Sequence, residues 1–160
     1  MKIIITLLFC FTSAVANADY LSCPCKVVKV LDGNTVYVLN PSNTKHKIGL
    51  AGIDAPEKKQ VFGNKSSQNL FNLVAGKHVE VEYSKRDRYG QIIGKLINNG
   101  QDVNLLQLKQ GYAWHDKNYQ KEQSELDRIL YSSAEIEARE KTIGLWSVPA
   151  VAPWEFRKNK

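Results

Sequence analysis

Cysteine, histidine and long apolar runs are scarce in this sequence. Three cysteines and three histidines occur among 160 residues, and the histidines lie too far apart in the sequence for the paired spacing of a metal site. After residue 18, no stretch offers the ~20 consecutive apolar residues that cross a bilayer. These absences argue against a zinc protein and against a transmembrane helix. The chain also has no internal repeat and no low-complexity linker.

The first eighteen residues have the pattern of a secretory signal peptide. Lys2 supplies the positive start, residues 3–11 are almost entirely apolar, and residues 16–18 (Ala-Asn-Ala) fit the small-x-small cleavage site. We predict a signal peptide over 1–18 and a single domain over 19–160, a usual size for one core. The protein is then exported, periplasmic or secreted, without a membrane span, and we expect a monomer.

After the predicted cleavage site the chain keeps only Cys23 and Cys25, which are separated by Pro24. A disulfide across one residue is strained. Three states therefore stay open: a strained local bridge, a disulfide to a partner protein, and free thiols. An envelope or extracellular interaction protein, held to its partner through Cys23 or Cys25, is one functional hypothesis.

The chain is moderately basic. Lys and Arg outnumber Asp and Glu by 22 to 16, which gives a formal net charge of +6. A basic surface attracts polyanions such as nucleic acid, but it can equally serve to keep an exported protein soluble. Charge alone therefore does not choose a function.

Alternating and β-branched residues predict five short strands. The expected strands cover residues 25–31, 35–39, 46–53, 78–83 and 92–97. Asp32, Gly33 and Asn34 separate the first two strands and form a strong hairpin-turn signal. The first three strands should form a meander.

Helical spacing begins at Gly63 and stops at Gly76, and it returns over 102–110 and 122–140. Asp102 is the expected cap of the second helix. Five strands with one interposed helix and further helices behind them indicate an α+β, mainly β fold. We predict a five-stranded Greek-key barrel of the OB kind with three helices, and a mixed α+β sandwich is the alternative.

Two carboxylates, three residues apart, follow the third predicted strand. Asp54 and Glu57 lie on either side of Pro56, which forces Ala55 towards extended geometry and stiffens the corner. Stiff paired carboxylates suit a hard metal ion or acid–base catalysis. An ordinary surface turn is the alternative.

Four motifs, taken together and in this order, resemble the staphylococcal nuclease, or thermonuclease, family. They are residues 30–36, residues 50–57, residues 87–90 (Asp-Arg-Tyr-Gly), and residues 104–106 with 111–113. The resemblance covers almost the whole chain after the signal, and the chain is identified as a member of that family. It implies an OB barrel with three helices and the calcium-dependent hydrolysis of phosphodiesters in DNA or RNA.

The resemblance also implies roles for individual residues. Glu57 corresponds to the general base that positions or deprotonates the attacking water. Asp54, Asn34 and the backbone carbonyl of Ala55 correspond to calcium ligands, and Asp32 to the nearby first acid of the turn. Arg88 and Tyr89 correspond to nucleotide-contacting residues. Together with Arg88, the basic residues Lys85, Arg86 and Lys95 form a candidate phosphate-tracking surface, for which a solvated charged turn is the alternative.

Three positions depart from the family pattern. Asn34 replaces a second acid, so its amide oxygen adds no charge and calcium should bind more weakly. Gly49 and Gln91 replace the two arginines that clamp the phosphate. Because removal of one preorganised donor typically costs about 10²–10³ in rate, we expect reduced or altered activity.

Two lysines are candidates to compensate for the missing arginines. Lys47 lies two residues before Gly49 and Lys95 lies four after Gln91, so each shares a strand face with a substituted position. Solvated strand lysines are the alternative. If nothing compensates, the chain is a catalytically inactive OB-fold module that binds nucleic acid or another polyanion. Tyr112, Trp114 and Tyr119 could stack bases in either case, or they pack within the fold.

Overall fold

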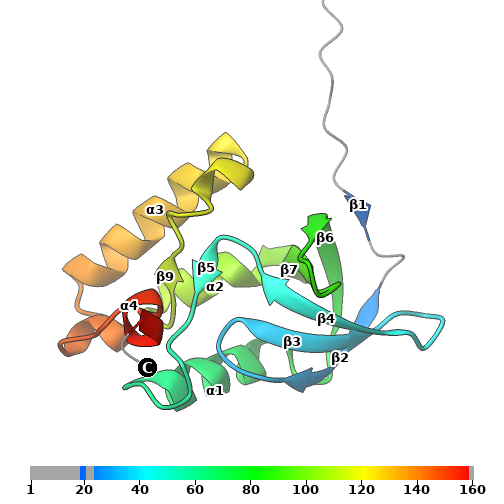
Figure 1. The fold of residues 1–160 in the computed structure, drawn as a ribbon, viewed down its shortest axis with the longest axis horizontal. Helices are drawn as coiled ribbons and strands as arrows, with labels where there is room; N and C mark the ends of the chain where they lie inside the picture. Colours follow the sequence, from blue (N-terminus) through cyan, green and yellow to red (C-terminus); the bar gives the residue numbers. More distant parts are fainter. Residues whose placement is uncertain (1–18, 21–23, 159–160) are drawn as a thin grey trace, which may run out of the picture.

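Five strands close into a barrel in the computed structural model, which describes residues 19–20 and 24–158 (Figure 1). The barrel strands are β2 (Cys25–Val30), β3 (Thr35–Leu39), β4 (Lys45–Leu50), β6 (His78–Arg86) and β7 (Ile92–Asn98). β2, β3 and β4 form an antiparallel meander, and β4 then pairs in parallel with β7. β6 closes the ring because it pairs antiparallel with both β7 and β2. The predicted five-stranded α+β barrel is confirmed.

Four short strands supplement the barrel. β1 (Asp19–Tyr20) pairs with β6 and β8 (Gln101–Asp102) pairs with β7, while β5 (Ile53–Asp54) and β9 (Trp114–His115) form a separate two-stranded sheet. The prediction of one strand over 46–53 is therefore wrong, because the chain leaves the barrel at Leu50. Gly52 makes the break at a left-handed φ of 73°. As a result, Asp54 lies on the small sheet and not on the barrel.

Three α-helices occur near their predicted places. They are α1 (Gly63–Val74), α2 (Val103–Lys109) and α3 (Glu125–Glu140). Asp102 caps α2 as expected, since its carboxylate accepts a bond from Leu105 N at 2.9 Å. α3 begins later than predicted because Ser124 is its cap and accepts a bond from Asp127 N at 3.0 Å. Within the described part of the chain, no helix has the length and apolar character to cross a membrane.

The C-terminal segment contains a further short helix that the sequence analysis did not predict. The 3₁₀ turns Gln120–Glu122 (η1) and Gly144–Ser147 (η2) precede α4 (Pro153–Lys158). Trp114 of β9 makes edge-on contacts with Trp146 at 5.3 Å and Trp154 at 6.5 Å between ring centroids. These contacts dock α4 beside the β5–β9 sheet (Figure 1). Trp146 and Trp154 therefore pack against the body of the domain.

Buried amides on α2 connect the barrel to the loops around β5. Asn104 Nδ2 donates to Ala51 O at 3.0 Å and to Gly94 O at 3.2 Å. Gln107 Nε2 donates to Gly33 O at 2.7 Å. Both side chains are completely buried. α2 therefore fixes the turn after β2 and the approach to β5 relative to each other.

Candidate active site

Asp54 and Glu57 stand on a firmly held corner. Asp54 ends β5, opposite Trp114 of β9, and its side chain is buried. Glu57 N donates to Gln60 Oε1 at 2.7 Å, and Gln60 N donates to Glu57 O at 2.8 Å. The start of α1 approaches so closely that a Cβ on Gly63 would lie 2.1 Å from Glu57 O. The backbone of Glu57 is therefore fixed from two sides.

Asn34 faces this corner from the turn between β2 and β3. Its backbone N–H donates to Asp32 Oδ1 at 3.0 Å, and its Nδ2 donates to Ile53 O at 3.3 Å, so it is bonded to the strand that carries Asp54. The four polar side chains line one hollow of about 420 Å³, here named the carboxylate hollow: Asp32, Asn34, Asp54 and Glu57. The structure thus brings together residues that the sequence analysis grouped.

The acidic and amide side chains of the carboxylate hollow offer oxygen atoms, the ligands that a hard cation prefers, while Lys58, Lys59 and Arg157 also line this hollow. Ala55, whose carbonyl the sequence analysis proposed as a further ligand, also lines the hollow. Across residues 19–20 and 24–158, however, no three His, Cys, Asp or Glu side chains form a ready metal cage. The donor chemistry fits calcium, with fewer charged ligands than a tight site would have.

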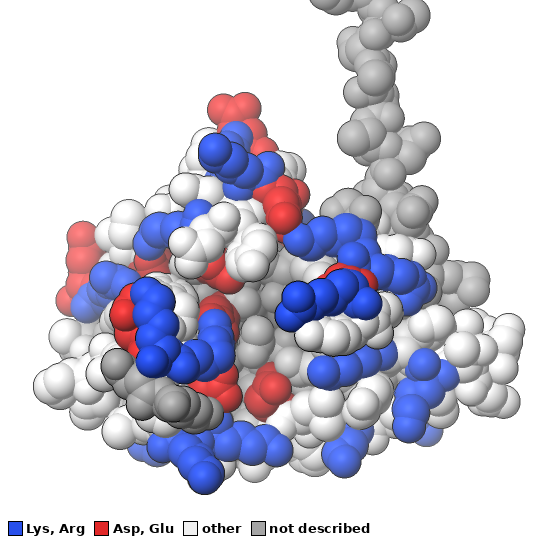
Figure 2. All heavy atoms as spheres, viewed as in Figure 1, with Lys and Arg blue, Asp and Glu red and all other residues white. Residues whose placement is uncertain are grey.

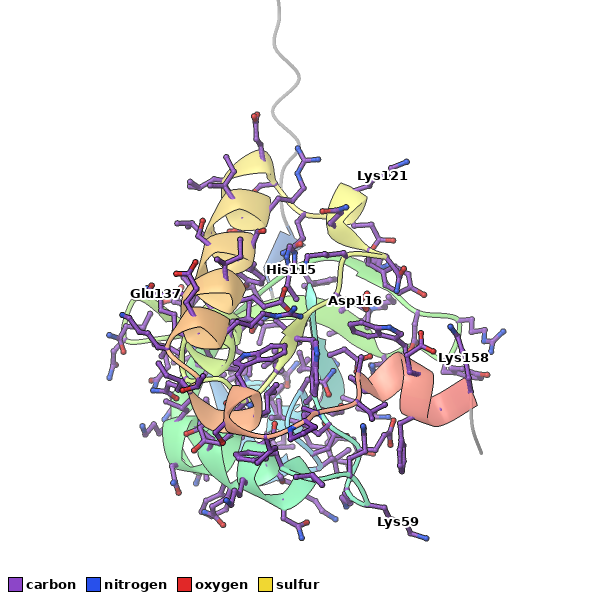
Figure 3. The ribbon with its side chains drawn as sticks, turned by 90° about the vertical axis from the view of Figure 1, so that its left-hand side faces the viewer. Lys59, His115, Asp116, Lys121, Glu137 and Lys158 are labelled. Atoms are coloured by element: carbon purple, nitrogen blue, oxygen red, sulfur yellow. The ribbon has the colours of Figure 1, made fainter. Side chains whose placement is uncertain are left out.

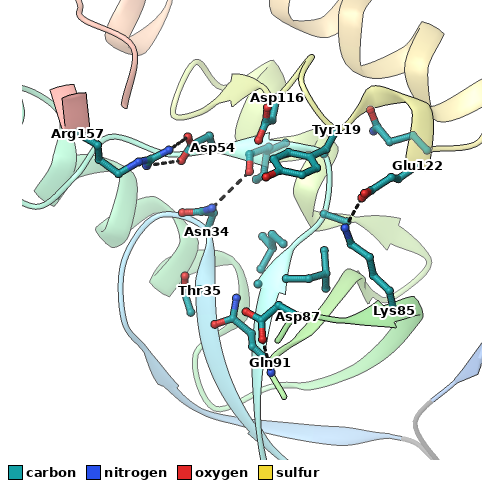
Figure 4. A pocket seen from close by; sticks show the side chains of 17 residues that line it. Asn34, Thr35, Asp54, Lys85, Asp87, Gln91, Asp116, Tyr119, Glu122 and Arg157 are labelled. Carbon is teal, nitrogen blue, oxygen red and sulfur yellow. Dashed lines mark hydrogen bonds and ion pairs between the residues drawn. The ribbon is translucent and has the colours of Figure 1, made fainter. Parts of the chain in front are cut away.

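A guanidinium already lies against both carboxylates of the corner. Arg157 Nη2 lies 2.7 Å from Asp54 Oδ2 and Nη1 lies 3.3 Å from Asp54 Oδ1 (Figure 4). Nη1 also lies 3.1 Å from Glu57 Oε1. Burial raises the pKa of the Asp54 carboxyl, and the hydrogen bonds and charge of Arg157 oppose that rise. The same bonds hold the pKa of Arg157 above its ordinary value. A divalent cation at this corner would therefore bind the same carboxylate oxygen atoms that Arg157 binds.

Arg157 was not predicted from the sequence, because 103 positions separate it from Asp54. No periodic pattern relates the C-terminal tail to the corner. The one feature of the sequence that indicates docking of the tail is Trp154, a large apolar side chain that is expected to pack against the domain. In the structure it packs on Trp114, which is the register partner of Asp54.

A second pocket of about 350 Å³ adjoins the corner, and we name it the clamp pocket because it contains both substituted arginine positions. A Cβ on Gly49 would lie 2.5 Å from Gln91 Nε2, so the amide of Gln91 covers Gly49. Figure 4 shows the labelled polar side chains of the lining: Asn34, Thr35, Asp54, Lys85, Asp87, Gln91, Asp116, Tyr119, Glu122 and Arg157. Acidic side chains outnumber basic ones in this lining.

The two lysines considered as substitutes lie elsewhere. Lys47 is exposed on β4, and Lys95 forms ion pairs with Asp127 at 2.8 Å and Asp102 at 3.6 Å. Burial alone would lower the pKa of Lys95, but its bond to Asp127 and the neighbouring acids raise the pKa overall. Neither lysine lines the clamp pocket. Each lysine shares a strand face with a substituted position but lies too far along its strand to line the clamp pocket.

The turn between β6 and β7 divides its charged residues between the pocket and the solvent. Lys85 lines the clamp pocket, where it pairs with Glu122. Arg88 and Tyr89 stack on each other at the tip, with 4.8 Å between guanidinium carbon and ring centroid, and the Tyr89 side chain is 79% exposed. Arg86 donates to the backbone of the same turn at Gly90 O, 3.1 Å away. Of the four predicted nucleic-acid contacts, only Lys85 lines the pocket.

The aromatic cluster is similarly divided. Trp114 is buried, and Tyr112 packs on Phe62 with 6.4 Å between ring centroids. Tyr119 is 55% exposed and lines the clamp pocket, with Lys85 Nζ 5.2 Å from its ring centroid. Tyr119 is therefore the member of the cluster whose position allows contact with a bound ligand.

His115 supports the pocket wall from behind. The residue is buried on β9, between α3 and α4 in Figure 3. Its Nε2 lies 2.8 Å from Gln123 Oε1, and its backbone N–H donates to Glu135 Oε1 at 3.1 Å. These contacts hold the segment that carries Asp116 and Tyr119. None of the three histidines lines the carboxylate hollow or the clamp pocket.

Comparisons with known proteins place this geometry in context. A family model described as "Staphylococcal nuclease homologue" matches residues 47–148. An Escherichia coli protein named "Uncharacterized endonuclease" is 41% identical and covers 99% of each chain. A protein of the same name from Haemophilus influenzae is 36% identical over 99% of this chain and 86% of its own. A "Micrococcal nuclease" from Shigella flexneri is 36% identical over 83% of this chain and 79% of its own.

Proposed function

The chain belongs to the staphylococcal nuclease family, and on this premise we propose that it hydrolyses phosphodiester bonds in DNA or RNA with the help of calcium. The observation that carries the proposal is the carboxylate hollow, in which Asp54 and Glu57 lie with Asn34 beside the clamp pocket. Relatives named as endonucleases align over almost the entire chain, which supports the same chemistry.

Each residue of the corner has a role in this proposal. Asp54, Asn34 and the Ala55 carbonyl would hold the calcium ion, and Asp32 orients Asn34 by accepting its backbone N–H. When bound, calcium offsets negative charge that develops on the phosphoryl group. Glu57, whose side chain is one-third exposed, accepts a proton from the attacking water. Gln60 and α1 keep Glu57 in position through its backbone.

We propose that the activity is lower than that of a site with both clamp arginines. Gln91 presents a neutral amide beside Gly49, where the family pattern has cationic forks. Asn34 removes one negative charge from the calcium ligands, so calcium binds more weakly. Both changes reduce the stabilisation of charge in the transition state.

We also propose that the protein is exported through the signal over 1–18 and acts as a single, monomeric domain over 19–160. The apolar start of the sequence and its Ala-Asn-Ala site support this proposal. The signal and Cys23 lie outside the described residues, and Cys25 is buried on β2. A disulfide to a partner therefore stays a prediction, to be checked on non-reducing gels.

Single-turnover cleavage of a labelled single-stranded DNA by the mature chain tests the proposed hydrolysis. We expect cleavage with calcium, none with EDTA, and a loss of about 10²-fold or more in Glu57→Gln. Glu80→Gln is the matched control, because Glu80 is an exposed acid on β6 that lines neither the carboxylate hollow nor the clamp pocket. If the folded wild-type protein cleaves DNA no faster than Glu57→Gln, the proposed hydrolytic activity is refuted.

The second candidate function is a catalytically inactive OB-fold module that binds nucleic acid or another polyanion. The loss of catalysis in such a module is favoured by the acidic lining of the clamp pocket and by the pairing of Arg157 with both corner carboxylates. In that case Asp54→Asn and Glu57→Gln would barely change DNA affinity. Replacement of basic surface residues would instead weaken the dependence of affinity on salt.

A further inference from the structure

Arg157 is one of four residues that line both the clamp pocket and the carboxylate hollow, and it is the basic one among them. Among the described residues, the cations that line the clamp pocket are Lys85 and Arg157, and Lys85 is paired with Glu122. Arg157 also lines the carboxylate hollow, next to Asp54 and Glu57. It lies beyond residues 47–148, the part of the chain that the family model matches. It is therefore a candidate cation that the family pattern does not supply.

The hydrogen bonds of Arg157 leave one edge of its guanidinium available. The group carries five N–H donors in a planar fork. Both hydrogens of Nη1 and one of Nη2 account for the bonds to Asp54 and Glu57. The Nε hydrogen and the second Nη2 hydrogen have no partner within 19–20 and 24–158. These two donors form a side-on pair of the kind that binds two oxygens of one phosphate.

Packing contacts of α4 hold Arg157, and with it the free edge of its guanidinium, beside the corner. Trp154, one turn before Arg157, packs against Trp114, the register partner of Asp54. Gln60, which holds the Glu57 backbone, also donates to Val151 O at 2.9 Å, just before α4. The side chain of Arg157 is still 47% exposed, so a ligand can reach it.

We propose that Arg157 binds a phosphate group of the nucleic-acid substrate and takes the place of the arginines absent at positions 49 and 91. The proposal rests on the proposed function of the same site. Asp54 and Glu57 accept hydrogen bonds from one edge of the guanidinium, and the Nε–Nη2 edge donates to two phosphate oxygens. The bound class is a phosphodiester, recognised by a bidentate contact that an ammonium group cannot make.

The test measures substrate affinity, calcium affinity and cleavage in three variants. Arg157→Gln removes the fork and the charge, Arg157→Lys keeps the charge and a partner for Asp54, and Lys158→Gln is the charge-matched control. The Lys158 side chain is 69% exposed and pairs with Glu155 at 3.0 Å. Affinity for a fluorescent single-stranded tetranucleotide is read by anisotropy with calcium and with EDTA. Calcium affinity is read by titration calorimetry without DNA, and unfolding midpoints establish that each variant folds.

We expect Arg157→Gln to weaken tetranucleotide binding about tenfold relative to Lys158→Gln, a loss of about 1.4 kcal/mol. Arg157→Lys should recover less than half of that loss in affinity on a logarithmic scale, because it lacks the fork. Single-turnover cleavage by Arg157→Gln should fall by about 10²–10³. Lys158→Gln should resemble the wild type in all three measurements.

Unchanged tetranucleotide affinity in Arg157→Gln, together with tighter calcium binding and faster cleavage, would overturn the proposal. Arg157 would then only compete with the cation for Asp54 and Glu57. A wild-type protein that binds the tetranucleotide but does not cleave it refutes the proposed hydrolysis, while the affinity comparison still tests Arg157. A wild-type protein that neither binds nor cleaves refutes both.

Discussion

At the scale of single residues, the glycines around the site differ in whether their neighbours could move to make room for a side chain. A Cβ on Gly49 would meet the far end of Gln91, a flexible side chain just before β7. A Cβ on Gly63 would instead meet the backbone of Glu57 at 2.1 Å. The first contact can be relieved by a rotation about side-chain bonds, whereas the second requires the corner itself to move.

We therefore predict that Gly63→Ala is much more harmful than Gly49→Ala. Gly63→Ala should lower the free energy of unfolding by about 1–3 kcal/mol through overpacking and slow cleavage by displacing Glu57. Gly49→Ala should cost less than about 1 kcal/mol. Urea unfolding and single-turnover cleavage measure both effects. Equal losses in the two variants would show that the Glu57 backbone is not held as tightly as the structure indicates.

His46 on β4 gives a second prediction at this scale. Partial burial and then the charge of Arg86 lower the pKa of His46, and its Nε2 has no partner among the described residues. The unfolded chain therefore takes up a proton more readily below pH 6.5, so the free energy of unfolding falls as pH drops from 6.5 through the lowered pKa. His46→Gln should flatten this part of the profile, measured by urea unfolding between pH 5 and 7.5. An unchanged slope would contradict the assigned burial.

Sequence patterns were sufficient for residues that act within one turn of chain. Asp54 and Glu57 could be placed on one corner because Pro56 constrains the backbone between them. The position of Arg157 depends on how the tail docks, which no local spacing encodes. For the same reason, the shared strand faces of Lys47 and Lys95 did not bring either lysine to the clamp pocket.

At the scale of elements, α2 joins the barrel to the site through a buried amide. Asn104 donates to Ala51 O and Gly94 O and accepts a bond from Leu96 N at 3.2 Å. Its side chain is completely buried. Loss of the amide leaves buried backbone groups unpaired, at about 1–3 kcal/mol for each group.

We predict that Asn104→Asp destabilises the fold more than Asn104→Ala does. An ionised carboxylate cannot donate to the two carbonyls and is costly to bury, whereas alanine loses the bonds without adding a charge. Asn104→Ala should lower the free energy of unfolding by about 2–4 kcal/mol, measured in urea at pH 7.5. An Asn104→Asp variant as stable as Asn104→Ala would mean that water reaches this site.

Elements with their own stop and start signals were predicted well, and those that depend on distant partners were not. Asp102 marks the start of α2, and Gly76 adopts a left-handed φ of 70° just after α1. The break after Leu50 was missed because the apolar run continues through Ile53. α4 was missed because it is short and its stability comes from packing on Trp114.

At the scale of the whole molecule, the net charge of +6 is unevenly distributed. Figure 2 shows acidic side chains within the hollowed part of one face and basic side chains around it. An acidic centre suits a cation, whereas the basic surroundings attract the backbone of a nucleic acid. The turn that carries Arg86 and Arg88 belongs to these surroundings, since both side chains are exposed.

This distribution predicts how DNA affinity depends on salt. For single-stranded DNA, the slope of log affinity against log salt is about −0.7 for each phosphate neutralised. Arg86→Gln with Arg88→Gln should therefore make the slope shallower by about 1.4 if both contact phosphates. The double variant Lys109→Gln with Lys141→Gln, which removes two exposed lysines at the ends of α2 and α3, is the charge-matched control.

Anisotropy titrations between about 50 and 200 mM salt provide the slopes, a range over which such contacts change affinity strongly. Equal slopes for the two double variants would mean that net charge alone attracts DNA and that the turn between β6 and β7 does not contact it. A shallower slope in the arginine variant alone would place the DNA backbone along this turn. The DNA strand would then pass from Tyr89, at the tip of this turn, to the clamp pocket, where Lys85 and Arg157 lie.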